Sequence, residues 1–216
     1  MGVQLQRKYN MYNPKEYWKN ELGGINAWRH DADTSINIIK SIDRLKTVVI
    51  PKMMELKKTI GGNILDAGCG SGFCINEFRL SGLWDEYYGI DFQEHRIKYS
   101  INKYENTCIK FQTGDLTVLP YENKFFDAIY TGAVLMHLPV EDKINSINEF
   151  KRVLTDDGFY FGHEIIHKGK ERIVDGGGHI INPNLEWLKE QFYPFNVKEL
   201  VLHFDNYDFQ IIYAHK

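Results

Sequence analysis

The chain has 216 residues, a length typical of one α/β domain. Apolar residues make up 43% and charged residues 25%, which excludes a disordered chain, a collagen-like repeat and a coiled coil. The formal net charge is −3, yet residues 1–60 hold 11 Lys or Arg against 6 Asp or Glu, so the leading segment is basic and the remainder acidic. Such a segment can attract an anionic partner, although solvated surface charge is the simpler explanation.

Membrane and secretion signals are not found in the sequence. There is no uninterrupted run of eighteen apolar residues, and the first twenty residues lack the apolar stretch of a signal peptide. The three cysteines (Cys69, Cys74 and Cys108) are an odd number without metal-ligand spacing. We therefore expect a cytoplasmic protein with reduced cysteines and no membrane partner. No nucleic-acid partner is expected either, because no basic stripe with interleaved aromatic residues is present.

Residues 1–60 are predicted to form a helical cap that is part of the same domain as residues 61–216. Aromatic residues and turn formers fill the first thirty positions. A helix is predicted from about Asp33, where capping residues precede spaced apolar positions. Pro51 is expected to begin or kink a second helical piece, and Gly61-Gly62 ends it.

Residues 61–216 alternate short apolar runs with amphipathic segments of helix length. This alternation predicts an α/β fold with a doubly wound, mostly parallel sheet. The last two strands are separated by Asp205-Asn206, a connection so short that they must be antiparallel neighbours. In chain order we expect strand 63–68, helix 72–81, strand 87–91, helix 93–104, strands 109–115 and 125–132, helix 141–153, strand 158–164, helix 182–192, and strands 196–204 and 207–215.

The most specific motif is the segment ILDAGCGSGFC at residues 64–74. Its first strand ends near Asp66, and Gly68, Gly70 and Gly72 follow at alternate positions. Glycines there allow a tight turn and bring backbone N–H groups close to a ligand at a helix N-terminus. A nucleotide-type ligand is the expected occupant. The dinucleotide pattern G-x-G-x-x-G is disfavoured, because its third glycine would fall on Phe73.

Acidic residues end the next two predicted strands. Asp91 ends the second strand, where a carboxylate can accept both hydroxyls of a ribose, and Phe92 can lie against an adenine face. Asp115 follows the third strand, where it can accept the exocyclic amine of adenine. Each acid alone is better explained as a helix cap or loop charge. Three acids at the ends of consecutive strands, beside the glycine turn, favour a ligand site.

This arrangement resembles the class I S-adenosylmethionine-dependent methyltransferases over roughly residues 61–216. The resemblance implies a seven-stranded Rossmann-like sheet with a reversed C-terminal strand, S-adenosylmethionine as co-substrate, and S-adenosylhomocysteine as product. Residues 125–138, FFDAIYTGAVLMHL, match the family's fourth strand and following loop. The donor-site residues implied in this core are Asp66, Gly68, Gly70, Gly72, Asp91, Phe92, Asp115, Leu116 and Thr131.

Methyl transfer to a hydroxyl or ammonium group also needs a base for the acceptor's proton. Such a base is expected beyond the fourth and fifth strands, where His137, His163 and Glu164 are the candidates. His137 is equally well explained as a packing residue. We leave the three unranked.

The N-terminal segment is expected to cover the site as a lid. Aromatic faces attract a sulfonium cation, which favours Tyr17 and Trp18 as lid residues. Arg29 is expected to pair with the donor's carboxylate or with an acidic acceptor. The prediction is therefore nitrogen or oxygen methylation of a small-molecule acceptor with an anionic group. A homo-oligomer is compatible with this reading.

Methylation of a protein remains open, and two alternatives of other classes remain. One is a non-catalytic S-adenosylmethionine-binding or regulatory module of the same fold. The other is a zinc hydrolase, because residues 163–167 read HEIIH and match H-E-x-x-H. That chemistry needs both histidines on one helical face, whereas the preceding FYFG alternates like a strand. The sequence therefore disfavours the hydrolase, and no metal is expected.

Overall fold

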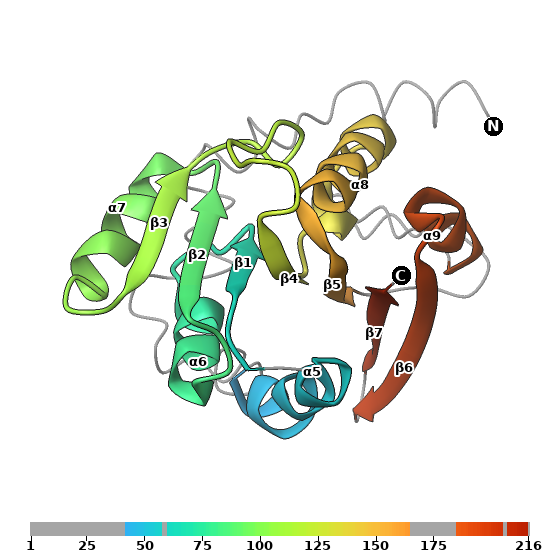
Figure 1. Ribbon diagram of the computed structural model, residues 1–216, viewed down its shortest axis with the longest axis horizontal. Helices are drawn as coiled ribbons and strands as arrows, with labels where there is room; N and C mark the ends of the chain where they lie inside the picture. The colour runs from blue at the N-terminus through green and yellow to red at the C-terminus, as the bar shows by residue number, and fades with distance from the viewer. Residues whose placement is uncertain (1–41, 58–59, 165–184, 205–206, 216) are drawn as a thin grey trace.

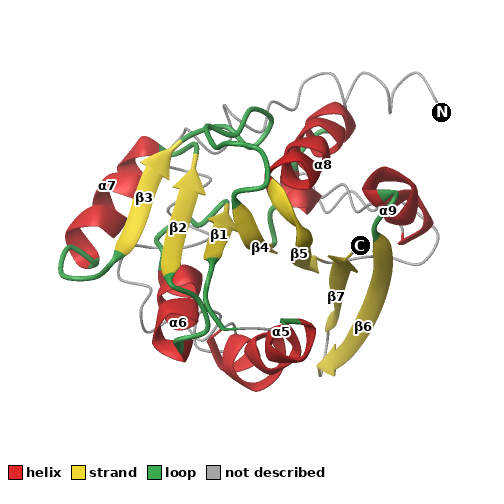
Figure 2. Ribbon diagram, in the orientation of Figure 1, coloured by secondary structure: helices red, strands yellow, loops and turns green. Residues whose placement is uncertain are grey.

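The computed structural model describes residues 42–57, 60–164, 185–204 and 207–215. Its centre is one seven-stranded sheet with the order β3-β2-β1-β4-β5-β7-β6, flanked by helices (Figures 1 and 2). The strands are β1 (Asn63–Ala67), β2 (Glu86–Asp91), β3 (Ile109–Thr113), β4 (Phe126–Gly132), β5 (Leu154–Glu164), β6 (Asn196–Phe204) and β7 (Tyr207–His215). The helical segments are η2 (Leu45–Val49), α5 (Ile50–Leu56), α6 (Phe73–Ser81), α7 (Glu94–Lys103), η3 (Leu135–His137), α8 (Val140–Val153) and α9 (Leu185–Phe192).

Strands β1 to β5 run parallel, and β7 lies antiparallel between β5 and β6. The predicted fold class is confirmed: a mostly parallel Rossmann-like sheet with a reversed C-terminal strand. The helix bounds agree with the expected ones to within two residues for α6, α7 and α8.

Two apolar clusters cover the two faces of the sheet. On one face, η2, α5 and α6 contribute buried residues such as Leu45, Met53 and Phe78. On the other face, α8 and α9 contribute residues such as Phe150 and Phe192. Both faces of the central strands are therefore buried, which explains why those strands read as nearly continuous apolar runs.

The order of the strands reverses direction beside β1. The chain builds β1, β2 and β3 outward on one side and then returns to place β4 on the other side of β1. In open α/β sheets, a ligand crevice forms at such a switch point, beyond the carboxyl ends of the strands. A ligand site is therefore expected between the loops that follow β1 and β4.

Strand β5 begins earlier than the sequence indicates. Leu154 pairs with Phe126 and is buried, whereas the expected start was residue 158. The register then shifts, so that Phe159 pairs with Ala128 and residues 155–158 form an irregularity. Burial of Leu154 against Phe126 outweighs the turn-forming TDDG sequence that follows it.

The predicted N-terminal helices are only partly covered by the described residues. The helix expected from about Asp33 lies mostly outside the described residues. Pro51 lies in the first turn of α5, which follows directly on the π-helical segment η2, so it begins a second helical piece of a continuous helix. No helix in the described part of the chain is long and apolar enough to cross a membrane.

Candidate functional site

The glycine turn after β1 lies against the loop after β4. The amides of Gly68 and Cys69 both donate to the Ile90 carbonyl, at 2.8 and 3.0 Å, which ties the turn to β2. Gly68 has φ +83°, and a Cβ atom there would lie 2.5 Å from Cγ2 of Val134. Only glycine therefore allows the two loops to approach this closely.

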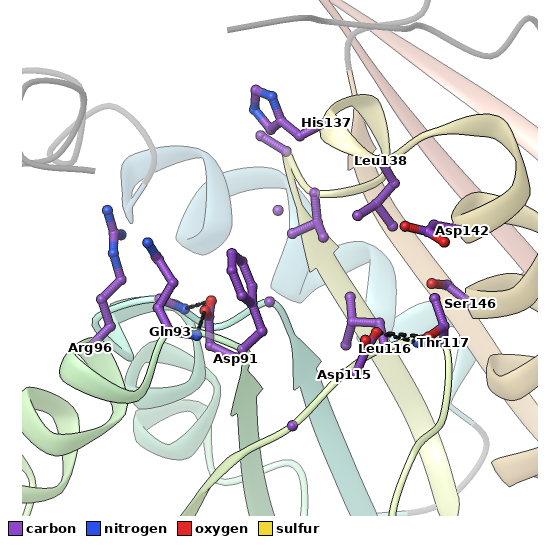
Figure 3. Close-up of a pocket in the computed structure, with 17 residues that line it drawn as sticks. Asp91, Gln93, Arg96, Asp115, Leu116, Thr117, His137, Leu138, Asp142 and Ser146 are labelled. Atoms are coloured by element: carbon purple, nitrogen blue, oxygen red, sulfur yellow. Dashed lines mark hydrogen bonds between the residues drawn. The ribbon is translucent and has the colours of Figure 1, made fainter. Parts of the chain in front are cut away.

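Asp91, the last residue of β2, holds the next part of the turn. Its Oδ2 accepts the Gly70 amide and its Oδ1 accepts the Gln93 amide, both at 2.9 Å (Figure 3). Burial raises the pKa of Asp91, although these two amides and the charge of Arg96 act in the opposite direction. The carboxylate is thus held in a fixed orientation by backbone donors from two loops.

Asp115 organises the loop after β3 in a similar way. Its Oδ1 accepts hydrogen bonds from the Thr117 amide at 3.0 Å and from the Thr117 hydroxyl at 2.8 Å. Further along this loop, the Leu119 amide donates to Oε2 of Glu149 at 2.7 Å. The loop is therefore fixed to α8 by a side chain that the sequence pattern alone does not reveal.

These loops enclose one pocket at the carboxyl ends of β1, β2, β3 and β4, completed by the first turn of α7 and the first two turns of α8 (Figure 3). Asp91, Gln93 and Arg96 lie on one side, and Asp142, Ser146 and Thr117 on the other. The lining residues are Gly68, Gly70, Asp91, Phe92, Gln93, Arg96, Gly114, Asp115, Leu116, Thr117, Gly132, Ala133, Val134, His137, Leu138, Asp142 and Ser146.

The predicted site residues divide into three groups. Seven of them line this pocket together: Gly68, Gly70, Asp91, Phe92, Asp115, Leu116 and His137. Four more lie in the described chain but not in the pocket lining: Asp66, Gly72, Thr131 and His163. Of Glu164 only the backbone, at the end of β5, is described. The remaining three, Tyr17, Trp18 and Arg29, lie outside the described residues, as does most of the proposed lid. The described part of that segment, η2 and α5, packs into a core cluster on the sheet and does not line the pocket.

Two residues of the second group support the pocket from behind. Gly72 is the N-cap of α6 at φ +76°, and a Cβ there would meet the Phe111 ring at 2.8 Å. Thr131 is fully buried in β4, with its hydroxyl hydrogen-bonded to the Tyr160 hydroxyl at 2.6 Å. Both residues therefore contribute to the packing behind the pocket loops and do not line the pocket.

Asp66 is a buried carboxyl group within β1. Burial, together with the nearby charge of Asp91, raises the pKa of Asp66 to about 8, despite a hydrogen bond with the Ile75 backbone. Its Oδ2 has no hydrogen-bond partner among the described residues. Asp66 is therefore mostly protonated at neutral pH in the folded protein.

The two candidate histidines differ in position. His137, at the end of η3, lines the pocket, and burial and the charge of Lys143 lower its pKa to about 4. His163 lies near the end of β5, where burial and the charge of Arg44 lower its pKa to about 3. The His163 carbonyl accepts the Ala133 amide at 2.8 Å, which fixes one pocket loop.

The H-E-x-x-H match begins on a strand. His163 and Glu164 are the last two residues of β5, paired with Ile211 and Gln210 of β7. Zinc hydrolases need this pattern on a helix, so the described half of the pattern has the wrong geometry. His167 lies outside the described residues. Within the described chain, no three His, Cys, Asp or Glu side chains gather as a metal site requires.

Several pocket residues were not singled out from the sequence. Gln93 and Arg96 follow Asp91 into α7, and Thr117 follows Asp115. Asp142 and Ser146 lie one turn apart on the same face of α8. Their i, i+4 spacing at the start of a helix that follows a strand end is the signal that could have identified them.

Comparisons with known proteins agree with this architecture. The pattern of the methyltransferase domain family matches residues 65–162. The chain is 31% identical to an uncharacterized chloroplastic methyltransferase of Arabidopsis thaliana over 121 residues, 53% of this chain and 34% of that protein. It is 33% identical to a sterol 24-C-methyltransferase of Pneumocystis carinii over 117 residues, 51% of this chain and 29% of that protein. It thus spans about a third of the length of these relatives.

The fold is also shared with solved structures. An S-adenosylmethionine-dependent methyltransferase from Clostridium acetobutylicum superposes with a TM-score of 0.70, at 12% identity over 88% of this chain and 98% of that one. At this identity the likeness concerns the fold. The matched domain, these relatives and the shared fold together support a class I S-adenosylmethionine-dependent methyltransferase family, whose co-substrate is S-adenosylmethionine.

Proposed function

We propose that this protein transfers a methyl group from S-adenosylmethionine to a nitrogen or oxygen atom of a small-molecule acceptor and releases S-adenosylhomocysteine. One observation carries the proposal. The glycine turn after β1, Asp91 at the end of β2 and Asp115 after β3 all line the same pocket. The matched methyltransferase domain and this convergence support the same donor.

The residues of the pocket fit that donor. Asp91 is held by two backbone amides and has further lone pairs with which to accept ribose hydroxyls. Phe92 supplies an apolar face for adenine. Asp115, whose Oδ1 is held by Thr117, can accept the exocyclic amine, and the neighbouring Leu116 amide can donate to the ring. Gly68 and Gly70 line the pocket, so that the backbone of the turn can approach a ligand.

When bound, the donor supplies a methyl carbon on a positively charged sulfur, so that an acceptor lone pair forms the new bond while the C–S electron pair returns to sulfur. The protein's task is then to hold the acceptor in line with that bond. Well-oriented reactants gain up to roughly 7–11 kcal/mol from positioning. The loop of Gly132, Ala133 and Val134 borders the pocket where such an acceptor would approach.

His137 is the best-placed candidate base in the described chain. It lines the pocket, and with its pKa lowered to about 4 its imidazole is neutral at neutral pH and can accept a proton. So weak a base contributes little driving force. We therefore assign most of the acceleration to positioning. His163 lies outside the pocket lining, which favours a supporting role for it.

The proposed chemical class of the acceptor is argued from the charge of the N-terminal segment. The basic composition of residues 1–60, which includes Arg29, supports an acceptor with a carboxylate or phosphate group. The name of the Pneumocystis relative denotes methylation at a sterol carbon. A neutral sterol is therefore the informative contrast to anionic nitrogen and oxygen acceptors.

The test measures binding and turnover separately. Calorimetry with S-adenosylhomocysteine should show binding to the wild type and strongly weakened binding to Asp91→Ala, with the exposed Asp157→Ala as control. Release of S-adenosylhomocysteine is then followed with a panel of anionic amines, anionic hydroxyl compounds and a sterol. Absence of binding would contradict the donor site. Binding without turnover on the whole panel would favour a non-catalytic binding module.

A further inference from the structure

Ser146 of α8 has an unusual environment for a serine. Its side chain is fully buried, it lines the pocket, and its Oγ has no hydrogen-bond partner in the described part of the chain. Buried hydroxyls are almost always hydrogen-bonded, so each exception needs an explanation. A hydroxyl beside a pocket is explained most simply by a partner that enters that pocket.

The position of Ser146 indicates which part of a ligand it would meet. In Figure 3, Ser146 and Asp142 extend from α8 on the side of Leu116 and Thr117, across the pocket from Gln93 and Arg96. The pocket has two hydroxyls among its lining residues. The Thr117 hydroxyl is already donated to Asp115, at 2.8 Å. Ser146 is thus the hydroxyl that can serve a ligand at this end.

We propose that Ser146 determines base specificity: its hydroxyl hydrogen-bonds to the N6–N7 edge of the donor's adenine. This inference rests on the proposed function, because Asp115 and Leu116, which share this end of the pocket, are assigned there to adenine. That edge offers an amine donor at N6 and an acceptor at N7. A serine hydroxyl can donate to N7 or accept from the amine.

The unpartnered Ser146 hydroxyl also has a predictable effect on the stability of the ligand-free protein. An unsatisfied buried hydroxyl destabilises the free protein, and serine is a poorer helix former than alanine. Ser146→Ala should therefore leave the ligand-free protein as stable as the wild type, or more stable, while weakening ligand binding. A merely structural serine would lose stability on the same substitution.

The experiment combines this substitution with altered ligands. Binding is measured by calorimetry for S-adenosylhomocysteine, for its 7-deaza analogue, and for its 6-deamino (purine) analogue, in which a hydrogen atom replaces the amine. We expect Ser146→Ala to weaken S-adenosylhomocysteine binding roughly three- to tenfold. With the analogue that lacks the contacted atom, that factor should fall to about one.

Ser81→Ala is the matched control. Ser81 ends α6, lies outside the pocket lining and donates to the Phe78 carbonyl at 2.6 Å. It should leave the affinity for all three ligands unchanged.

Three results would overturn the inference: an unchanged affinity of Ser146→Ala for S-adenosylhomocysteine, the same loss with all three ligands, or a lowered melting temperature of the ligand-free variant. Failure of the wild type to bind S-adenosylhomocysteine would overturn the proposed function as well. Wild-type binding with no effect of Ser146→Ala would overturn this inference alone.

Discussion

The Asp91 carboxylate accepts the amide of Gly70 at 2.9 Å and so joins the end of β2 to the turn after β1. Its second oxygen accepts the Gln93 amide at the same distance. One side chain therefore fixes two loops of the pocket and still has lone pairs to offer a ligand. Structural and binding roles are combined in this residue, and a substitution series can separate them.

Asp91→Ala should weaken S-adenosylhomocysteine binding roughly ten- to a hundredfold, because hydrogen bonds to a charged group contribute about 1.5–3 kcal/mol. Asp91→Asn keeps one acceptor oxygen and should lose less. Calorimetry gives the affinities, and the melting temperature of the ligand-free variants reports the lost Gly70 contact. Equal affinity of Asp91→Ala and wild type would contradict the ribose-binding role.

The stability of the protein should decrease with rising pH because of Asp66. Its pKa is about 8 when folded and near 3.8 as an unperturbed group. Between these values the folded state holds a proton that the unfolded state has released, so stability falls as pH rises through this range. Below the lower value both states are protonated, and the destabilising contribution of Asp66 disappears.

Asp66→Asn removes this titration and is nearly the same size. The difference in melting temperature between the variant and the wild type, measured from pH 5 to pH 9, should shift in favour of the variant as pH rises. Other titrating groups are common to both proteins and cancel in the difference. A difference that stays constant over this range would show that Asp66 is ionised in the folded protein.

The order of the elements could be predicted from local periodicity. Runs such as Ile64-Leu65 and the spaced apolar positions of α8 are signals within one segment. The start of β5 could not be predicted in this way. Leu154 joins the strand through its pairing with Phe126, which is a contact between segments distant in the sequence. Local turn preference is overridden there by burial.

The site was predictable only where it follows strand ends. Asp91 is the last residue of β2 and Asp115 lies two residues after the end of β3, so their placement depends on topology alone. Thr131 belongs to the family-like segment 125–138, but it is fully buried, and its hydroxyl is hydrogen-bonded to the Tyr160 hydroxyl. Ser146 reaches the pocket because of the way α8 packs on the sheet. Motif membership does not distinguish a lining residue from one that packs behind the loop.

Arg152 should be important for the loop that contains Asp115. Its guanidinium donates to the carbonyls of Leu119 at 3.0 Å and Tyr121 at 2.8 Å, and to both oxygens of Glu149 at 2.7 Å. Arg152→Lys keeps the charge but cannot reproduce this fork of donors. We expect a loss of about 1–3 kcal/mol in the free energy of unfolding, together with weaker S-adenosylhomocysteine binding.

Lys124→Ala is the control for this prediction. Lys124 forms an exposed ion pair with Asp156 at 2.7 Å, and such pairs contribute less than about 1 kcal/mol. Urea unfolding of both variants gives the two free energies. If Arg152→Lys cost no more than Lys124→Ala, the loop would be held by its backbone alone.

His137 should remain neutral across the physiological pH range. Burial and the nearby Lys143 charge lower its pKa to about 4. The unfolded chain takes up a proton near pH 6.5, whereas the folded protein does so only near pH 4. Stability is therefore lost as pH falls through this window, and His137→Asn should reduce that loss.

Titration by NMR tests the assignment directly. The imidazole Cε1–H signal, identified as the one missing from His137→Asn, should keep its chemical shift from pH 8 to pH 5, while free histidine in the same buffer titrates near 6.5. If His137 removes the acceptor's proton, the ascending limb of kcat/KM against pH lies near pH 4 and not near pH 6.5. A midpoint of the His137 shift above pH 6 would contradict both statements, since it would place a charged imidazole in the pocket at neutral pH.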